Sequence, residues 1–106
     1  MVKRGDIWLV ALDPTIGSEV RKSRPCMVIS PPKMHDYLRT VSVAPMTTGS
    51  RPAPFRVRIR FQGKTRLILL DQTRTLDRQR LVKRLGRAGN PTLLTTLRTL
   101  QDVFAP

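Results

Sequence analysis

Two short stretches of the sequence combine arginine or hydroxyl side chains with proline, and both are candidates for phosphodiester chemistry. Ser23-Arg24-Pro25 comes just before an apolar run that is typical of a strand, and Pro45-Met46-Thr47-Thr48-Gly49 comes at the end of another. An arginine binds phosphate through parallel N–H groups, and a threonine hydroxyl can donate a further hydrogen bond. In a small barrel the two strand ends could face one cleft. From composition alone, Arg24 is one arginine among many and the threonine pair could equally cap a turn.

Other catalytic arrangements lack the residues that they need. The chain has one histidine, His35, so an acid–base pair of histidines is impossible. Its seven acidic residues are scattered, and no two have a spacing that builds a metal cage, so we expect no metal and no other cofactor. His35-Asp36 is a weak pair that we interpret as part of a surface turn. No phosphate-binding loop and no GxGxxG, GxSxG or HExxH motif occurs.

The positive charge of the chain is large and unevenly distributed. Twenty Lys and Arg residues against seven Asp and Glu give the 106 residues a formal charge of +13. This favours a nucleic acid partner over the alternative, a solvated face that only keeps the protein soluble. Arginine outnumbers lysine, which suits contact with phosphate. Twelve of the twenty lie in one stretch: Arg51, Arg56, Arg58, Arg60, Lys64, Arg66, Arg74, Arg78, Arg80, Lys83, Arg84 and Arg87.

The aromatic residues argue against binding of single strands by base stacking alone. Patterning assigns Trp8, Phe55, Phe61 and Phe104 to core faces, so an aromatic platform is poorly supported. No helix-turn-helix period, zinc-finger spacing or ribonucleoprotein motif is present. A module that only binds nucleic acid is therefore not recognisable from its motifs.

Short apolar runs, punctuated by proline and glycine, predict a mainly β fold in one domain over residues 1–106. We expect strands over 5–12, 26–30, 40–46, 55–61 and 65–70, a strand or helical turn over 81–85, and a short helical turn over 33–38. Residues 15–23 and 49–54 are expected as loops, and 71–80 as a polar, irregular segment. From 55 to 61, apolar side chains alternate with Arg56, Arg58 and Arg60, so a strand there has one core face and one strongly positive face.

The chain ends in a predicted helix. Asn90 is a good N-cap, and Pro91 suits the first turn. Apolar residues then recur at helical spacing, at Leu93, Leu97, Leu100 and Phe104. Several short strands with one C-terminal helix describe a small, curved sheet or barrel with a helix against it.

Location and cysteine usage fit an ordinary small protein of the cell interior. The longest apolar run, 7–12, is far shorter than the roughly 20 residues that cross a bilayer, and the first residues do not form a signal peptide. We therefore expect a cytoplasmic protein with no membrane association. Cys26 is the only cysteine, and its apolar neighbours indicate a small core residue rather than a nucleophile.

Taken in order, a set of short motifs resembles the MazF/PemK-type toxins of bacterial type II toxin–antitoxin systems, over roughly residues 3–103. The resemblance implies a homodimeric SH3-like barrel of five to seven strands with a C-terminal helix. It further implies a metal-independent, sequence-specific endoribonuclease that cleaves single-stranded RNA and is neutralised by a cognate acidic antitoxin. The matching motifs are Gly5-Asp6-Ile7-Trp8, Asp13-Pro14-Thr15, Gly17-Ser18-Glu19, Arg24-Pro25, Val28-Ile29-Ser30-Pro31, Pro45-Met46-Thr47-Thr48, Pro54-Phe55, Asp71-Gln72 and Arg74-Thr75.

The resemblance also implies roles for individual residues. Arg24 and Thr47 match the catalytic arginine and threonine of the family, which act on the phosphate while the 2′-hydroxyl of the substrate attacks it. The products are a 2′,3′-cyclic phosphate and a 5′-hydroxyl. Asp71 is a candidate general base. The alternative is that it only helps to form a turn at the end of a strand. The residues expected to contact RNA are Glu19, Lys22, Thr48, Gln72 and Arg74; Glu19 could equally be a plain loop carboxylate.

Two positions depart from the Kid-type members of the family. Those members carry an arginine two residues before the Asp-Gln pair, where this chain has Leu69, and a histidine where it has Ser18. The arginine that acts as the alternative acid in those members is therefore missing at its position, which leaves the chemistry to Arg24.

Two other classes of function stay open at this point. One is a basic module that binds nucleic acid without cutting it. The other is a gyrase-directed toxin of the CcdB type, which has the same barrel and engages gyrase through a C-terminal end that carries a tryptophan. In this chain the only tryptophan is Trp8, in the first expected strand.

Overall fold

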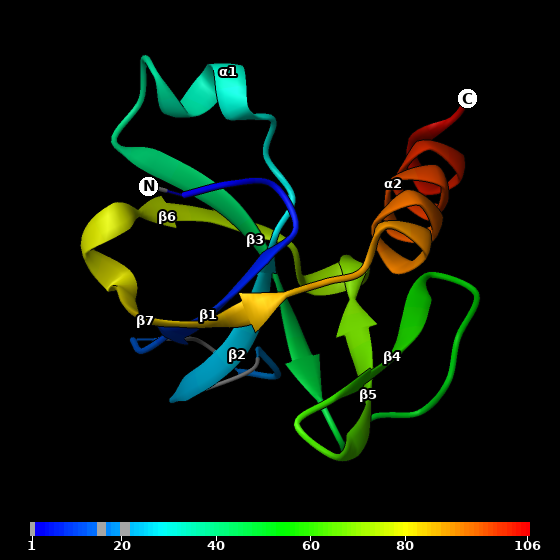
Figure 1. Ribbon diagram of the computed structural model, residues 1–106. Coiled ribbons are helices and arrows are strands. Elements are labelled where there is room, and N and C mark those ends of the chain that lie inside the picture. Colours follow the sequence, from blue (N-terminus) through cyan, green and yellow to red (C-terminus); the bar gives the residue numbers. More distant parts are fainter. Residues whose placement is uncertain (1, 15–16, 20–21) are drawn as a thin grey trace.

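The strands form one strongly curled sheet in the computed structural model, which describes residues 2–14, 17–19 and 22–106 (Figure 1). Within those residues the sheet has seven antiparallel strands in the order β4-β5-β3-β2-β1-β7, and β6 pairs with β3. The prediction of a mainly β, barrel-like fold with a C-terminal helix is confirmed. The strands are β1 (Asp6–Ala11), β2 (Ser23–Val28), β3 (Thr40–Thr47), β4 (Arg56–Phe61), β5 (Lys64–Leu69), β6 (Arg74–Asp77) and β7 (Leu81–Arg87), with helices α1 (Pro32–His35) and α2 (Asn90–Phe104) and 3-10 turns η1 (Leu70–Gln72) and η2 (Arg78–Arg80). Thr15, Ile16, Val20 and Arg21 of the predicted loop lie outside the described residues.

Strand β3 joins the two halves of the sheet. One edge of β3 pairs with β2, from Cys26↔Pro45 to Val28↔Val43. Its other edge pairs first with β6, over Thr40 to Val43, and then with β5 at Met46 and Thr47. The turn η1 links β5 to β6 along this second edge, so residues 70–72 are fixed beside the middle of β3.

The core lies on both faces of the central strands, because successive side chains of a strand point to opposite faces. One cluster, between the sheet and α2, contains Ile7, Met27, Met46 and Ile68, with Leu93 and Leu100 of the helix packed against it. The second cluster lies inside the curl. Its members are Val10, Leu12, Cys26, Val28, Val41, Val43 and Leu76.

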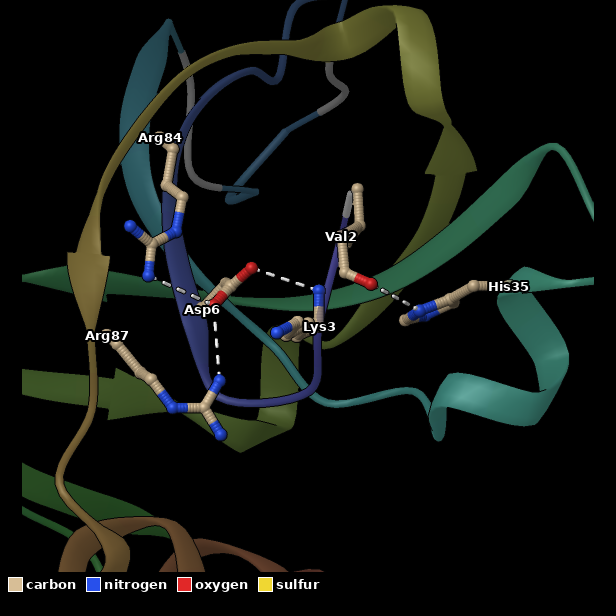
Figure 2. Close-up of polar contacts among 6 residues, drawn as sticks. All are labelled: Val2, Lys3, Asp6, His35, Arg84 and Arg87. Atoms are coloured by element: carbon tan, nitrogen blue, oxygen red, sulfur yellow. Dashed lines mark hydrogen bonds and ion pairs between the residues drawn. The ribbon is translucent and has the colours of Figure 1, made fainter.

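The start of β1 is tied to β7 through a group that we call the Asp6 cluster: Asp6, Lys3, Arg84 and Arg87. Asp6 is only 1 % exposed. Its Oδ2 accepts the backbone N–H of Lys3 at 2.9 Å, and its Oδ1 lies 3.5 Å from Arg84 Nη2 and 3.3 Å from Arg87 Nη1 (Figure 2). The buried carboxylate is thus paired with two partly exposed guanidinium groups that connect the two strands.

Gly5, immediately before β1, has to be a glycine. Its φ of +89° is a conformation that residues with a Cβ rarely adopt, and a Cβ there would lie 3.1 Å from a methyl carbon of Leu93. The tight turn brings α2 against the first strand, and the Gly5 carbonyl accepts the N–H of Ala88 at 2.8 Å.

Three predictions about elements were wrong. The segment 71–80 is not irregular: it contains η1, β6 and η2, and β6 was missed because only Leu76 in it is buried. The second strand begins at Ser23, three residues before the apolar run, since Arg24 and Pro25 pair with Val10 and Leu9 of β1 while staying largely outside the core. The N-cap residue of α2 is Gly89, not Asn90, and no side chain caps the helix by a hydrogen bond. Asn90 is already the first residue of the helix.

Three side chains also lie elsewhere than predicted. His35 is buried rather than part of a surface turn, and its ring hydrogen-bonds Ser30 Oγ at 2.7 Å. The other ring nitrogen lies 3.2 Å from the Val2 carbonyl, and Figure 2 shows this second hydrogen bond. Phe104 is 76 % exposed and Phe55 is 37 % exposed, so neither belongs to the core. Phe104 falls in the last turn of α2, beyond the reach of the sheet that covers Leu93 and Leu100.

Candidate active site

A hollow of about 180 Å³ opens where η1 lies beside β3. Its walls come from the end of the first strand, the loop after it, β3 and the segment 71–74. Four of its residues, Glu19, Asp71, Gln72 and Arg74, were predicted as site residues. The full lining is Leu12, Glu19, Pro45, Asp71, Gln72, Thr73 and Arg74.

Asp71 is held by an arginine from the neighbouring strand. Arg56 donates from Nε to Asp71 Oδ1 at 3.2 Å and from Nη2 to Asp71 Oδ2 at 3.0 Å. Arg56 lies opposite Leu69 in the β4–β5 ladder, and Asp71 follows Leu69 by two residues. The hydrogen bonds from Arg56 lower the pKa of the Asp71 carboxyl below its usual value, in spite of partial burial. The carboxylate is therefore fixed in its ionised form.

Arg74 and Thr73 form the inner wall of the hollow. Arg74 Nη1 donates to the Leu12 carbonyl at 3.2 Å, which ties the first residue of β6 to the end of the first strand. The Thr73 hydroxyl is buried, and no hydrogen-bond partner for it lies among the described residues. Gln72 is half-buried between Asp71 and Thr73.

Arg24 and Thr47 do not line the hollow but lie on the strands that lead from it. Pro45, one wall of the hollow, pairs with Cys26; Thr47 follows Pro45 by two residues, and Arg24 precedes Cys26 by two. A step of two residues along a strand keeps a side chain on the same face. The register therefore puts both residues on the face that carries the hollow, where β3 leaves β2 and begins to pair with β5.

The immediate surroundings of these two residues are polar at Thr47 and apolar behind Arg24. The Thr47 hydroxyl and Ser50 Oγ hydrogen-bond each other at 2.8 Å, which orients the threonine. Arg24 is exposed, and its carbonyl accepts the thiol of Cys26 at 3.5 Å. Cys26 is fully buried, as predicted, and burial raises the pKa of its thiol to about 12.

The remaining predicted RNA contacts, Lys22 and Thr48, are exposed residues next to strand ends. Lys22 has a left-handed backbone conformation, with φ of 66°, and its carbonyl accepts the N–H of Leu12 at 3.0 Å. Thr48 begins the bend that follows β3. Neither lines the hollow, so the structure brings together four of the eight predicted residues there and distributes the other four around it.

Two groups in or beside the hollow were not predicted from the sequence. The first is Arg56: although Leu69 stands at the position of the Kid-type arginine, an arginine from the neighbouring strand lies opposite Leu69 and pairs with Asp71. The signal for it was the hairpin: a turn at Gln62-Gly63 pairs Phe61 with Lys64 and hence Arg56 with Leu69. Thr73 gave no signal at all, since it is one polar residue in a polar segment.

The residues of the site are arginines, hydroxyls and single carboxylates. Among the residues that the structure describes, no three His, Cys, Asp or Glu side chains come together in a way that could hold a metal ion. Nor does the described part of the chain contain a helix long and apolar enough to cross a membrane.

A curled sheet with a C-terminal helix and a polar hollow beside its central strand defines a small basic β protein with a surface site. Residues 3–104 match the family described as the PemK-like, MazF-like toxin of type II toxin–antitoxin systems. The chain belongs to this family, and the resemblance predicted from its motifs is confirmed.

Curated relatives and solved structures agree with that assignment. The chain is 35 % identical to the endoribonuclease PemK of Escherichia coli over 97 % of this chain and 82 % of the relative. It is 36 % identical to the endoribonuclease MazF of Staphylococcus epidermidis over 80 % and 76 %, respectively. In fold it is similar to MazF from Deinococcus radiodurans, with a TM-score of 0.86, 24 % identity and coverage of 99 % and 97 %.

Proposed function

We propose that this toxin is a sequence-specific endoribonuclease that cleaves single-stranded RNA without a metal ion. One observation carries the proposal: Glu19, which was assigned to the site from motif order, lines the same hollow as Asp71, Gln72 and Arg74, which were assigned in the same way but lie much further along the chain. The two curated relatives are both endoribonucleases, which supports the same class of reaction.

The proposed reaction needs no group that the chain lacks. The 2′-oxygen of a ribose bonds to the adjacent phosphorus, the bond from phosphorus to the 5′-oxygen breaks, and the products are a 2′,3′-cyclic phosphate and a 5′-hydroxyl. The 2′-hydroxyl passes its proton to bulk water, and the leaving 5′-oxygen takes a proton back from water, so the protons balance. Negative charge builds up on the phosphate oxygens in between, so fixed cations and hydrogen-bond donors beside the phosphate accelerate the step.

In this proposal Arg24 and Thr47 act on the phosphate. Arg24 projects from the exposed end of β2 and stabilises the developing charge through its guanidinium. Thr47, oriented by Ser50, donates a hydrogen bond to the same phosphate. Glu19, Gln72 and Arg74 in the hollow, with Lys22 and Thr48 outside it, contact the neighbouring nucleotides and set the preferred sequence.

The general affinity for RNA comes from the exposed arginines of β4. Arg58 and Arg60 are exposed on the same face of the strand, while Val57 and Ile59 between them are buried. The alternation predicted for this strand is confirmed there. A protein that contacts about six phosphates of a single strand has a slope of log K against log salt concentration near −4.

The partners of the toxin follow from its charge and its exposed apolar side chains. A flexible acidic antitoxin can occupy the basic surface in place of RNA; one structural neighbour, with a TM-score of 0.83 and 19 % identity, is an endoribonuclease in complex with its cognate antitoxin from mycobacterial species. Leu94 and Phe104, both exposed on α2, supply apolar surface for a homodimer. A toxin of this kind acts in the cytoplasm, where RNA is its substrate.

Cleavage in the presence of EDTA tests the proposal. The wild-type protein should cut mixed-sequence single-stranded RNA into discrete fragments, while Arg24→Ala lowers the rate by about 10³-fold and Thr47→Ala by about 10²-fold, as expected when a donor to the transition state is lost. Arg39→Ala, in the exposed bend before β3, is the matched control. Undiminished cutting by both site variants would contradict the assignment of the site.

The same assay separates the alternatives. A module that only binds nucleic acid leaves the RNA intact at every salt concentration while its affinity falls with salt. A gyrase-directed toxin inhibits DNA supercoiling by gyrase and does not cut RNA. The position of Trp8 within β1, away from the C-terminal end, argues against the second alternative.

A further inference from the structure

We infer that Arg56 is a second phosphate-binding guanidinium of the active site, and that Asp71 positions Arg56 instead of accepting the proton of the 2′-hydroxyl. This inference rests on the proposed ribonuclease function and deepens it, since it assigns the roles of two side chains at the same site.

The geometry of the pair makes the arginine rigid. Both oxygens of Asp71 are engaged by Arg56, at 3.2 Å and 3.0 Å, in the two-pronged arrangement that is typical of arginine and carboxylate. Arg56 Nη1 donates to the Arg51 carbonyl at 2.9 Å, and its guanidinium lies 5.8 Å from the centre of the Phe55 ring. The guanidinium is therefore held from three sides.

Arg56 nevertheless keeps hydrogen-bond donors for a ligand. A guanidinium has five N–H groups. Three of these are used: Nε and one on Nη2 by Asp71, and one on Nη1 by the Arg51 carbonyl. One N–H on each Nη atom has no partner among the described residues. The arginine side chain is 19 % exposed, so these donors can reach an anion at the surface of the site.

Asp71 in this pair is a poor proton acceptor. A general base works best when its pKa is close to the working pH. The hydrogen bonds from Arg56 move the pKa of Asp71 in the opposite direction, and they occupy both of its oxygens. The same contacts suit a positioning role, because they fix the guanidinium at the edge of the hollow that Asp71 lines.

Its fixed position distinguishes Arg56 from the other arginines of β4. Arg58 and Arg60 lie on the same face at a spacing of two residues but are exposed. A mobile arginine contributes charge to RNA binding, and it loses conformational freedom when it binds. A guanidinium that is already fixed pays no such cost, so it stabilises the charge of the transition state more effectively.

Steady-state cleavage of a short single-stranded RNA in EDTA, with kcat and KM determined separately, tests the inference. Arg56→Ala should lower kcat by about 10²-fold with a smaller change in KM, because the guanidinium acts on the transition state. Arg56→Lys should restore only part of the rate, since a lysine keeps the charge but lacks the fork. Arg39→Ala, in the exposed bend before β3, is the matched control, and circular dichroism melts establish that each variant is folded.

Asp71→Asn separates the two roles of the carboxylate. The amide can still accept a hydrogen bond from Arg56, so we expect a fall in kcat of about tenfold. If Asp71 were the base, Asp71→Asn would abolish cleavage, while Arg56→Ala would leave a more basic carboxylate and an active enzyme. Either of those results overturns the inference.

The outcomes also distinguish this inference from the proposed function. If the wild-type protein cuts RNA and Arg24→Ala does not, but Arg56→Ala keeps kcat within threefold of wild type, the inference fails and the ribonuclease function stands. If the wild-type protein cuts no RNA, both fail. A change in KM alone for Arg56→Ala also overturns the inference, because it shows ground-state binding only.

Discussion

The Asp6 cluster and the Asp71–Arg56 pair use the same chemistry, a carboxylate with arginine, at two different depths. Asp6 is almost completely buried and shares one oxygen between two arginines at 3.3–3.5 Å, while its second oxygen accepts a backbone N–H. The Asp71 side chain is 30 % exposed and binds one arginine through both oxygens at 3.0–3.2 Å. The first arrangement connects strands; the second presents a fixed guanidinium at a hollow.

The difference shows that the depth of burial decides whether an arginine–carboxylate pair serves stability or function. A buried carboxylate needs its partners, because an unpaired charge in the interior is costly. An exposed ion pair adds little to stability, since water and salt screen it. The same pair can still matter for activity when it holds a side chain beside a reacting phosphate.

The largest expected difference between the two sites is in stability. Asp6→Asn should lower the free energy of unfolding by about 2–3 kcal/mol, because buried hydrogen bonds to a charged group are lost. Urea unfolding measures this change. Asp71→Asn is the matched control, with an expected loss below about 1 kcal/mol. Equal losses of unfolding free energy for the two variants would show that the depth of burial does not determine how much each carboxylate contributes to stability.

The two sites should behave in the opposite way in catalysis. Asp6→Asn should keep the kcat of RNA cleavage at a temperature well below its melting point, whereas Asp71→Asn lowers it by about tenfold, or about 1.4 kcal/mol. Steady-state assays of both folded variants measure this contrast. A comparable loss of kcat in folded Asp6→Asn would mean that the Asp6 cluster also serves the reaction.

The smallest effect is the pH dependence of stability that Asp71 contributes. Its pKa in the folded protein is lower than in the unfolded chain, so its contribution is present above the unfolded value of about 3.9 and is lost as the pH falls through the folded value. Unfolding from pH 6 to pH 2 should therefore show a slightly steeper loss for wild type than for Asp71→Asn, by less than about 1 kcal/mol in total. Parallel curves would contradict a lowered pKa.

Much of the fold could be predicted because its strands follow simple patterns. The alternation from Val57 to Arg60 and the turn at Gln62-Gly63 indicated the β4–β5 hairpin, and Leu93 with Leu100 indicated the buried side of α2. Strand β6 could not be predicted, because it is polar and is held by pairing with β3. Pairing of this kind depends on residues 31 to 37 positions away and leaves no local signal.

The site was predictable in its members but not in its contacts. Motif order indicated Glu19, Asp71, Gln72 and Arg74, and the structure places them in one hollow. The partner of Asp71 has no local signal near Asp71, because Arg56 comes from β4 and lies opposite Leu69 across the ladder. Side chains on neighbouring strands are as close as those two residues apart along one strand. The register of the hairpin, and not the order of residues along the chain, therefore brings the arginine to Asp71.

Cys26 gives the protein a built-in reporter for the strand that carries Arg24. It is the only thiol in the chain, it is fully buried in β2, and its pKa is raised to about 12. Alkylating reagents attack the thiolate, so labelling at pH 8 requires that β2 first separates from its neighbours. The rate of labelling thus measures local opening of this strand in the native protein, with no engineered probe. A ligand that binds Arg24, whether RNA or an antitoxin, stabilises β2 in the sheet. Such a ligand will slow the labelling of Cys26, and a tighter ligand will slow it more.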